Sequence, residues 1–494
     1  MFRYFRFIIV FLLLSIWFIP ANAQPEQKQY SLEKVIQRAQ LHSPDALLAK
    51  HRFRNSYWQY RTFKATNLPR LSLDATLPDF NRSIANITQP DGSVSFRSQF
   101  QANSSAYLSL AQNIGLTGGQ VFMNSGLQRI DLLGGSKSTS YLASPLYIGI
   151  SQPIWGFNAY KWSKRIEPIK YQEAKSVYLE DMERLSIRAT ALFFDLLLAQ
   201  ISYEIASNNQ ANNDTIYKIT KGRYNLGKIA ENELLQMELR LLNSNNELEQ
   251  SKLQVEITTF ALKSFLGIKN DERFKLIPPI DCKRFTVDYK LALSEALENR
   301  SEAISFDRRV YEAQSELEKV KADNRLSVDV YAVYGLTQSG PDIETTYRNP
   351  EDQQKLMVGL QLPILDWGLA KGRSKMAESN MELIQTRVDQ DRIDFEKELY
   401  LKVMQFNMQM TQLLIASKAD TIGQKRFKVS KHRYLIGKID ITDLNLAQEE
   451  KDMARKNYIS TLRLYWDSYF EIRRLTLFDF LKNERIDVDY SLLY

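Results

Sequence analysis

Two very long stretches of the chain have a helical pattern with almost no helix-breaking residues. Residues 159–224 and 369–434 contain one proline and three glycines between them. In the first stretch, apolar residues recur at alternating steps of four and three, the spacing of a coiled-coil seam. These seam residues are Tyr178, Met182, Leu185, Ala189, Leu192 and Leu196. Because a helix rises 1.5 Å per residue, each stretch predicts a rod of about 100 Å.

A glycine turn follows each long stretch, and a second helical pattern begins after it. One of these patterns repeats large apolar residues every seven positions, and its counterpart repeats mostly small ones, which favours close approach of helices. The two sets are Leu234, Leu241, Leu248, Val255 and Leu262, and Ala447, Ala454, Thr461 and Ser468. The pattern predicts two antiparallel coiled-coil hairpins. The low content of turn formers, 19 glycines and 14 prolines in 494 residues, agrees with long uninterrupted elements.

Alternating apolar and polar residues predict strands before the long helices. The strands expected to form the core of the sheet are residues 71–77, 146–150, 326–334 and 356–362. An additional hairpin is expected from residues 107–112 and 120–130. For this hairpin we favour a loop or cap over a place in the sheet. A soluble β-sandwich has the same alternation, but so few strands between such long helices make that architecture unfavourable.

An internal repeat relates the two halves. The sequence RYNLGKI at 223–229 returns as RYLIGKI at 433–439, and LYIGISQPI at 146–154 returns as LMVGLQLPI at 356–364, both after 210 residues. Earlier, RLSLD at 70–74 matches RLSVD at 325–329 after 255 residues. The change of offset places about 45 extra residues in the first half, where the additional hairpin lies.

These patterns divide the chain into five segments. Residues 1–23 resemble a secretory signal, with two arginines, a short apolar run and an Ala-Asn-Ala cleavage pattern. The others are a first structural repeat (24–266), an inter-repeat segment (267–290), a second structural repeat (291–474) and a C-terminal tail (475–494). An exported protein without a second helical membrane span is soluble in the periplasm, secreted, or inserted into a membrane as a β-barrel.

Composition excludes several classes of protein. The net charge of +7 is spread along the chain, which does not indicate nucleic-acid binding. One cysteine and three histidines, none at ligand spacing, leave no basis for a disulfide framework or a zinc site. The sequence contains no nucleophile elbow and no phosphate-binding glycine loop. We therefore expect no enzyme activity, no cofactor and no metal.

Acidic residues follow the second glycine turn. Asp440 or Thr442 is placed to cap the next helix, and Asp443 adds negative charge near its positive end. One interpretation is that these acids are purely structural. The alternative is an acidic ring at the mouth of a pore, which requires several copies of the chain.

The long helices, the Arg-Tyr-x-x-Gly turns and the segment DLNLAQ at 443–448 resemble the TolC-like outer-membrane efflux proteins. The strand-to-helix junctions at 153–154 and 363–368 are also similar to that family. The resemblance covers roughly residues 31–475. It implies an α+β membrane protein whose duplicated long-helix hairpins form a trimeric α-helical periplasmic tunnel, joined to a shared 12-stranded outer-membrane β-barrel. An equatorial layer would come from the termini and residues 265–289.

Elementary physics favours the same trimer. Four strands per chain cannot close a barrel without edges, and unpaired strand edges are untenable in lipid. Three chains supply 12 strands. The family resemblance further implies a passive channel, working with a periplasmic adaptor and an inner-membrane pump.

The resemblance also implies site residues. Asp443, and Glu233 as its counterpart in the first repeat, fall on the acidic pore entrance, and Tyr434 falls on a residue that locks neighbouring helices. A second acidic position of the family falls on Leu446 and a basic lock position on Ile439, so this chain departs from the pattern. Adaptor docking is expected at the turns, with Arg223, Tyr224, Gly227, Arg433 and Gly437.

Two other functions share these features. A type I protein-secretion conduit has the same architecture, because the pump selects the cargo. A periplasmic coiled-coil scaffold without a pore has the same helices but needs no outer-membrane sheet.

Overall fold

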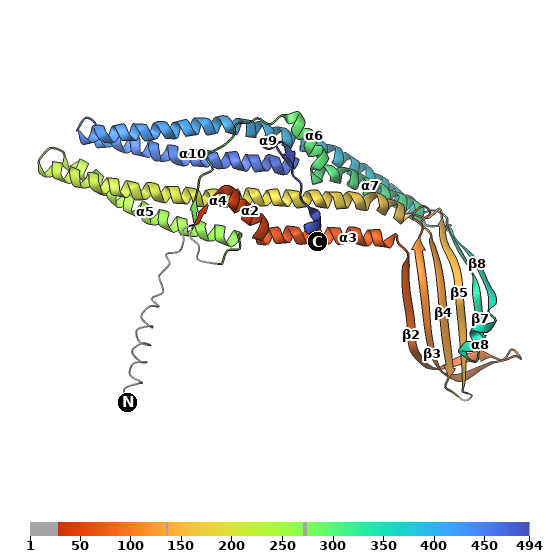
Figure 1. Cartoon of the computed structure of the whole chain (residues 1–494). Coiled ribbons are helices and arrows are strands. Elements are labelled where there is room, and N and C mark those ends of the chain that lie inside the picture. Colours follow the sequence, from red (N-terminus) through yellow and green to blue (C-terminus); the bar gives the residue numbers. More distant parts are fainter. Residues whose placement is uncertain (1–27, 135–136, 270–273, 494) are drawn as a thin grey trace, which may run out of the picture. The chain divides into compact units, whose positions relative to one another are not determined.

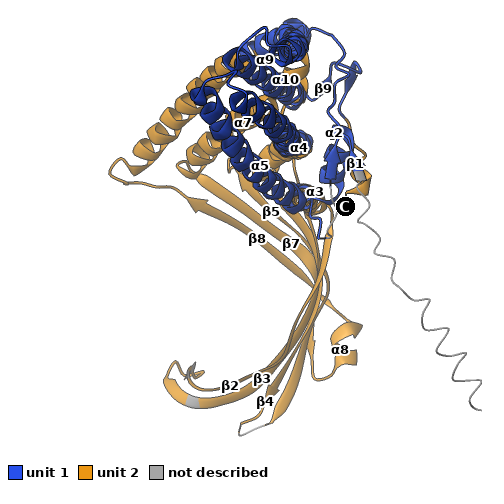
Figure 2. Ribbon diagram, turned by 90° about the vertical axis from the view of Figure 1, so that its left-hand side faces the viewer, with its two compact units in different colours: residues 1–49, 179–292, 400–486 blue, residues 50–178, 293–399, 487–494 orange. Residues whose placement is uncertain are grey.

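The computed structural model describes residues 28–134, 137–269 and 274–493. The segment expected to be a signal peptide, residues 1–23, lies outside the described residues. Two compact units divide the chain (Figure 2): one comprises residues 1–49, 179–292 and 400–486, and the other residues 50–178, 293–399 and 487–494. Each unit draws on both sequence repeats, because the long helices run through both units.

Four long helices form the two predicted hairpins (Figure 1). Helix α4 (Ala159–Asn225) is followed by α5 (Glu231–Phe265), and α9 (Leu369–Leu435) is followed by α10 (Ile441–Thr476). Helices α4 and α9 both have 67 residues and begin at equivalent positions of the repeat. Five of the six seam residues predicted in α4 are buried, and Leu192 is half-buried. The predicted helical hairpins are therefore confirmed.

Shorter helices repeat in the same way. Helices α2 (Leu32–His42) and α6 (Tyr289–Asn299) have 11 residues each, and α3 (Pro44–Thr66) and α7 (Ser301–Asp323) have 23 each. Both pairs begin 257 residues apart. The duplication thus extends to helices that the sequence motifs did not mark.

An antiparallel sheet of six strands lies within the second unit, as far as the described residues show. Its order is β2-β3-β4-β5-β7-β8. The strands are β2 (Arg70–Thr88), β3 (Val94–Asn113), β4 (Gln120–Leu132), β5 (Ser138–Ile154), β7 (Ser327–Gly340) and β8 (Glu351–Gln361). A short helix, α8 (Ile343–Arg348), connects β7 to β8.

The additional hairpin is β3–β4, and the expectation that it forms a loop or cap is wrong. Strand β3 pairs with β2 from Arg70↔Ala111 to Thr88↔Val94, and β4 pairs with β5 from Gln120↔Ser151 to Leu132↔Ser138. Both strands therefore satisfy their backbone groups within the sheet on both sides. The sheet has six strands where the sequence predicted four, because long alternating strands are more stable in a ladder than as an exposed hairpin.

Short elements lie near both ends of the described chain. Strand β1 (Lys28–Tyr30) pairs in parallel with β6 (Phe274–Leu276) of the inter-repeat segment, and the side chain of Gln200 bonds to the backbone of β6 at both Phe274 and Leu276. After α10, β9 (Phe478–Asp479) pairs with β10 (Glu484–Arg485), and a 3-10 turn follows at Tyr490–Leu492. The pairing of β1 with β6 supports the expected layer built from the N-terminal and inter-repeat segments.

Helix α4 is also long and apolar enough to cross a membrane by length and composition. However, 56% of its apolar window is buried inside the chain. Burial of this kind is expected of a core helix in a coiled coil.

A buried ionic network ties the end of α10 to α4. Arg473 donates to the Glu183 carboxylate on α4 at 2.9 Å and to the Asp479 carboxylate on β9 at 3.1 Å. The hydroxyl of Tyr469 donates to the other Asp479 oxygen at 2.7 Å. The Glu183 and Asp479 side chains are only 2% and 4% exposed, so Arg473 is the cation that compensates two desolvated acids.

Candidate pore entrance at the helix turns

Both hairpins of the first unit turn in the same way. In the first, the N–H of Lys228 donates to the carbonyl of Arg223 at 2.9 Å and that of Gly227 to Tyr224 at 2.8 Å. In the second, Lys438 and Gly437 make the corresponding bonds to Arg433 and Tyr434, both at 2.9 Å. This is the Schellman arrangement, which satisfies the last carbonyls of a helix and needs a left-handed residue. Gly227 and Gly437 supply it with φ of +68° and +72°.

Replacing Gly437 by alanine is expected to destabilise the turn by about 1–2 kcal/mol, because an L-residue is strained in this conformation. A Cβ at Gly437 would meet nothing within 4 Å, so the cost is conformational and not steric. The matched control is Gly222→Ala within α4, where the space is equally open and φ is not positive. That variant should be stabilised by about 0.5–1 kcal/mol. Amide hydrogen exchange at the turn measures both effects; equal protection in the two variants would contradict the prediction.

The first turn of α10 places one acid as a cap and leaves another exposed. The Asp440 carboxylate accepts from the backbone N–H of Asp443 at 2.9 Å, which makes Asp440 the N-cap. The side chain of Asp443 is exposed. The structural interpretation thus holds for Asp440, whereas the carboxylate of Asp443 points to solvent and adds charge to the helix end.

The equivalent position in the first repeat differs. Helix α5 begins after Ala230, which makes no side-chain capping bond, and its first turn carries Glu231 and Glu233. Glu233 is half-buried. Two acids near an uncapped helix start are favourable because the helix dipole is positive there.

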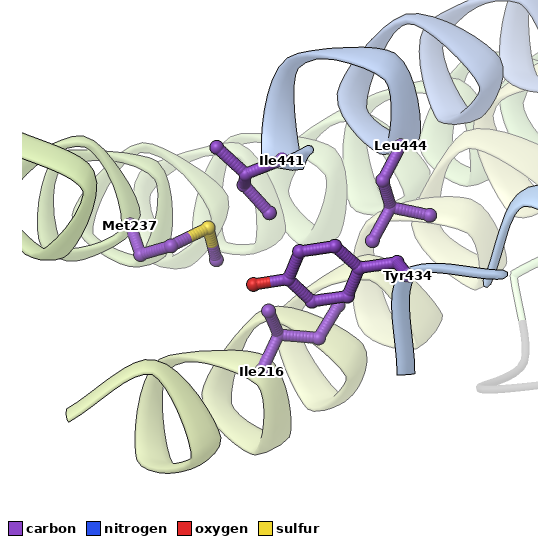
Figure 3. Close-up of a cluster of buried hydrophobic side chains, with 5 residues drawn as sticks. All are labelled: Ile216, Met237, Tyr434, Ile441 and Leu444. Atoms are coloured by element: carbon purple, nitrogen blue, oxygen red, sulfur yellow. The ribbon is translucent and has the colours of Figure 1, made fainter. Parts of the chain in front are cut away.

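Tyr434 lies at the centre of a small apolar cluster beside the turns. Figure 3 shows its ring among Ile216 of α4, Met237 of α5, and Ile441 and Leu444 of α10. Only 5% of Tyr434 is exposed, and its hydroxyl lies 3.3 Å from the hydroxyl of Thr220 on α4. Tyr434 therefore connects one hairpin of the chain to the other.

Arg223 reinforces this connection. Its guanidinium donates to the carbonyl of Leu435 at 3.1 Å and lies 5.5 Å from the centre of the Tyr434 ring, a cation–π distance. Tyr224, the repeat counterpart of Tyr434, is 37% exposed instead. Two residues from identical motifs thus have different environments.

The structure brings most of the expected residues together around the two turns. Of the two positions that depart from the family pattern, Ile439 packs against the Tyr434 cluster and Leu446 is 48% exposed. The sequence reasoning missed Thr220, the partner of the Tyr434 hydroxyl. It also missed two exposed apolar residues at equivalent turn positions, Leu226 and Ile436, at 72% and 66% exposure. Their signal was the repeat itself, since both lie between the tyrosine and the glycine.

Polar contacts continue along the hairpins beyond the turns. The side-chain amide of Asn209 on α4 donates to Asp452 on α10 at 2.7 Å, and Arg240 on α5 pairs with Glu449 at 3.2 Å. These residues line a groove of about 710 Å³ among α4, α5 and α10. Across the part of the chain that the structure describes, no group of three or more His, Cys, Asp and Glu side chains is arranged to hold a metal ion. Polar and charged side chains thus line much of the groove.

Residues 292–476, nearly all of the second repeat, match the family model described as outer membrane efflux protein. The match identifies the second repeat of the chain as similar to this family. Both this match and the fold are those of outer-membrane channels with a periplasmic helical extension.

Solved structures of outer-membrane channels share its fold. The CmeC channel of Campylobacter jejuni is 16% identical with a TM-score of 0.64, over 93% of this chain and 88% of CmeC. VceC of Vibrio cholerae is 12% identical with a TM-score of 0.63, over 92% and 97% of the two chains. MtrE of Neisseria gonorrhoeae, in an open state, is 14% identical with a TM-score of 0.53, over 90% and 88%. No curated protein sequence matches the chain. At these identities the structures establish the TolC-like fold and nothing finer.

Proposed function

We propose that three copies of this chain form a passive conduit that receives substrates from an inner-membrane pump through a periplasmic adaptor. The observation that carries this proposal is that one chain combines an apolar sheet with exposed helix turns. Its sheet has strands of 11 to 20 residues with exposed apolar side chains, and its helices end in turns with exposed acids and apolar residues. Strands of at least 9–11 residues are long enough to cross a bilayer.

Channels of this family are trimers that work with an adaptor and a pump, and the single chain supports the same assembly. The sheet ends at two unpaired edges, β2 and β8, which lipid does not tolerate. Closure by identical copies removes both edges. A periplasmic scaffold without a pore has no use for exposed leucines on such a sheet, so this alternative is disfavoured.

Conduction requires no chemistry from the chain. The pump supplies the energy and selects the cargo, so a type I protein-secretion conduit remains the second candidate. The polar groove and the ion pairs along the hairpins are compatible with either cargo.

Within this proposal, Asp443 and Glu233 form the acidic entrance and Tyr434 locks the hairpins. The exposed positions of the turns (Tyr224, Leu226 and Ile436) suit docking of an adaptor, with Arg223 and Arg433 beside them. The exposed carboxylate of Asp443 supports its role, because its neighbour Asp440 already serves as the cap. The proposal places three copies of each acid around one opening.

We expect Asp443→Asn to lower the cation selectivity of the reconstituted channel. Three charges about 10 Å from the axis stabilise a cation and destabilise an anion by roughly 0.4 kcal/mol each after screening in physiological salt, so the cation-to-anion permeability ratio should fall about three- to fourfold. Reversal potentials in a potassium chloride gradient measure this ratio. Asp214→Asn removes the same charge from α4, where Asp214 pairs with Lys218, and should leave the ratio unchanged. Equal reversal potentials for wild type and Asp443→Asn would remove Asp443 from the entrance.

A further inference from the structure

Strands β3 and β4 have the same pattern of side chains on the two faces of the sheet as the other strands. Residues paired directly across strands share a face of the sheet. One such row runs across five strands and is apolar throughout, and each member is at least 37% exposed. It consists of Leu71, Leu110, Met123, Ile148 and Tyr334. The hairpin supplies two members of this row, so an apolar band runs without interruption from β2 to β7; on β8 the row continues at Gln354.

The opposite face of the sheet is polar or small at the neighbouring row. That row consists of Ser72, Ser109, Asn124, Tyr147 and Gly335. Further along the same face, the side-chain amide of Gln128 on β4 donates to Asn103 on β3 at 3.0 Å. Strands with one apolar and one polar face are typical of a barrel wall between lipid and a water-filled lumen. Strands β3 and β4 have the same two faces as their neighbours.

Aromatic residues lie opposite glycines at three successive strand pairs on the polar face, and at the first two pairs the aromatic ring itself lies next to the glycine. Tyr107 lies opposite Gly126, Phe122 opposite Gly149, and Tyr147 opposite Gly335. A Cβ on any of these glycines would come within 2.2–2.3 Å of the facing aromatic residue. Glycines covered by aromatic rings allow strands to curve while keeping their register. These aromatic–glycine pairs extend from β3 to β7, so the β3–β4 hairpin is curved together with the rest of the sheet.

The two edges of the sheet fit each other. The six strands alternate in direction, so β2 and β8 run antiparallel. Both edges continue the apolar face, with Leu71 and Leu73 exposed on β2, and Leu356 and Val358 exposed on β8. Antiparallel edges of identical copies can pair around a ring without a break in the alternation.

We propose that three copies close an 18-stranded barrel, with β2 of one copy paired to β8 of the next. This inference rests on the trimer of the proposed function and concerns the size of its outer-membrane pore. With strands about 4.8 Å apart and tilted by about 40°, 18 strands give a backbone diameter of about 36 Å, and 12 strands give about 24 Å. The hairpin therefore widens the barrel by half while the number of long helices stays the same.

The test is single-particle imaging of the full mature protein in a lipid nanodisc, beside a variant without the hairpin. In that variant, residues 89–137 are replaced by Asn-Gly, which joins β2 directly to β5 in the antiparallel sense. We expect a three-fold particle with 18 strands and a diameter of about 36 Å for the wild type. The variant should have 12 strands and a diameter of about 24 Å.

The outcomes separate this inference from the proposed function. A wild-type trimer with a barrel of about 24 Å and β3–β4 outside the wall would overturn the 18-stranded barrel and leave the conduit intact. A particle without three-fold symmetry or without a barrel would overturn the conduit itself. If the variant fails to assemble, the strand count of the wild-type particle still decides the question.

Discussion

Replacing Arg473 by leucine is expected to destabilise the protein by about 3–5 kcal/mol, the usual cost of leaving buried charges without their partner. Arg473 compensates the carboxylates of Glu183 and Asp479, both almost fully buried. Its loss separates α4 from the segment that follows α10. The midpoint of thermal unfolding, followed by circular dichroism in detergent, measures the effect.

The stability lost in Arg473→Leu should increase as the pH rises. Burial raises the pKa of Glu183 above its ordinary value, and the attraction of Arg473 opposes that rise. A raised acid pKa gives stability that is present at low pH and lost as the pH rises through the folded pKa. Without Arg473 the pKa of Glu183 rises further. The Arg473→Leu variant should therefore lose least stability relative to the wild type near pH 5 and most near pH 8.

An exposed ion pair provides the control for this experiment. Lys218 pairs with Asp214 on the surface of α4, with 73% of the lysine side chain exposed. Lys218→Leu should change stability by less than about 1 kcal/mol at any pH. If Arg473→Leu behaved like this control, the network would not hold α10 and its following segment to α4.

Truncating Tyr434 to alanine is expected to loosen the entrance and raise the conductance of the reconstituted channel. Removing a buried aromatic ring costs about 3–5 kcal/mol and leaves a cavity among Ile216, Met237 and Leu444. The contacts of the ring between the two hairpins are then lost, and the hydrogen bond from Arg223 to the Leu435 carbonyl remains. Single-channel recordings in planar bilayers should show larger or longer openings.

Two control variants test whether the effect comes from the Tyr434 ring. One removes only the hydroxyl, and the other removes the equivalent tyrosine of the first repeat. Tyr434→Phe removes only the contact with Thr220 and should cost about 1 kcal/mol. Tyr224→Ala removes the exposed counterpart and should leave the packing within one chain unchanged. A closed, wild-type conductance for Tyr434→Ala would show that this cluster does not restrain the entrance.

The long helices were predicted almost to the residue because very few residues in them compete with the helical pattern: one proline, Pro168, lies inside α4. The predicted stretches 159–224 and 369–434 end one residue before α4 and α9 do. The glycines of the Schellman turns define these ends, since the left-handed residue of such a turn is usually glycine.

The sheet was predicted only in part. Alternation identifies a strand with two faces, but it does not say which strands are neighbours, and so the hairpin was misplaced. The far half of β2 was missed because Pro78 and the polar residues after it interrupt the alternation. In the structure, Pro78 lies at a register shift between Thr76 and Asp79, where its missing N–H breaks no ladder bond of regular pairing.

At the turns, the local motifs were clear and the tertiary partners were not. Tyr224 and Tyr434 occupy the same position in the two Arg-Tyr-x-x-Gly motifs, yet only Tyr434 is buried. Ile441 and Leu444 cover it, whereas Glu231 stands at the first-repeat position of Ile441. The difference between isoleucine and glutamate at these equivalent positions was the available signal.

The equal lengths of α4 and α9 place a constraint on how this protein can change in evolution. Both turns belong to the same compact unit, and the contact of Tyr434 with α4 requires them to stay level. An insertion in one hairpin alone would change its coiled-coil register, and its turn would no longer lie beside the turn of the other hairpin. Lineages with longer or shorter tunnels should therefore have gained or lost residues in both repeats together, in multiples of seven that keep the coiled-coil phase.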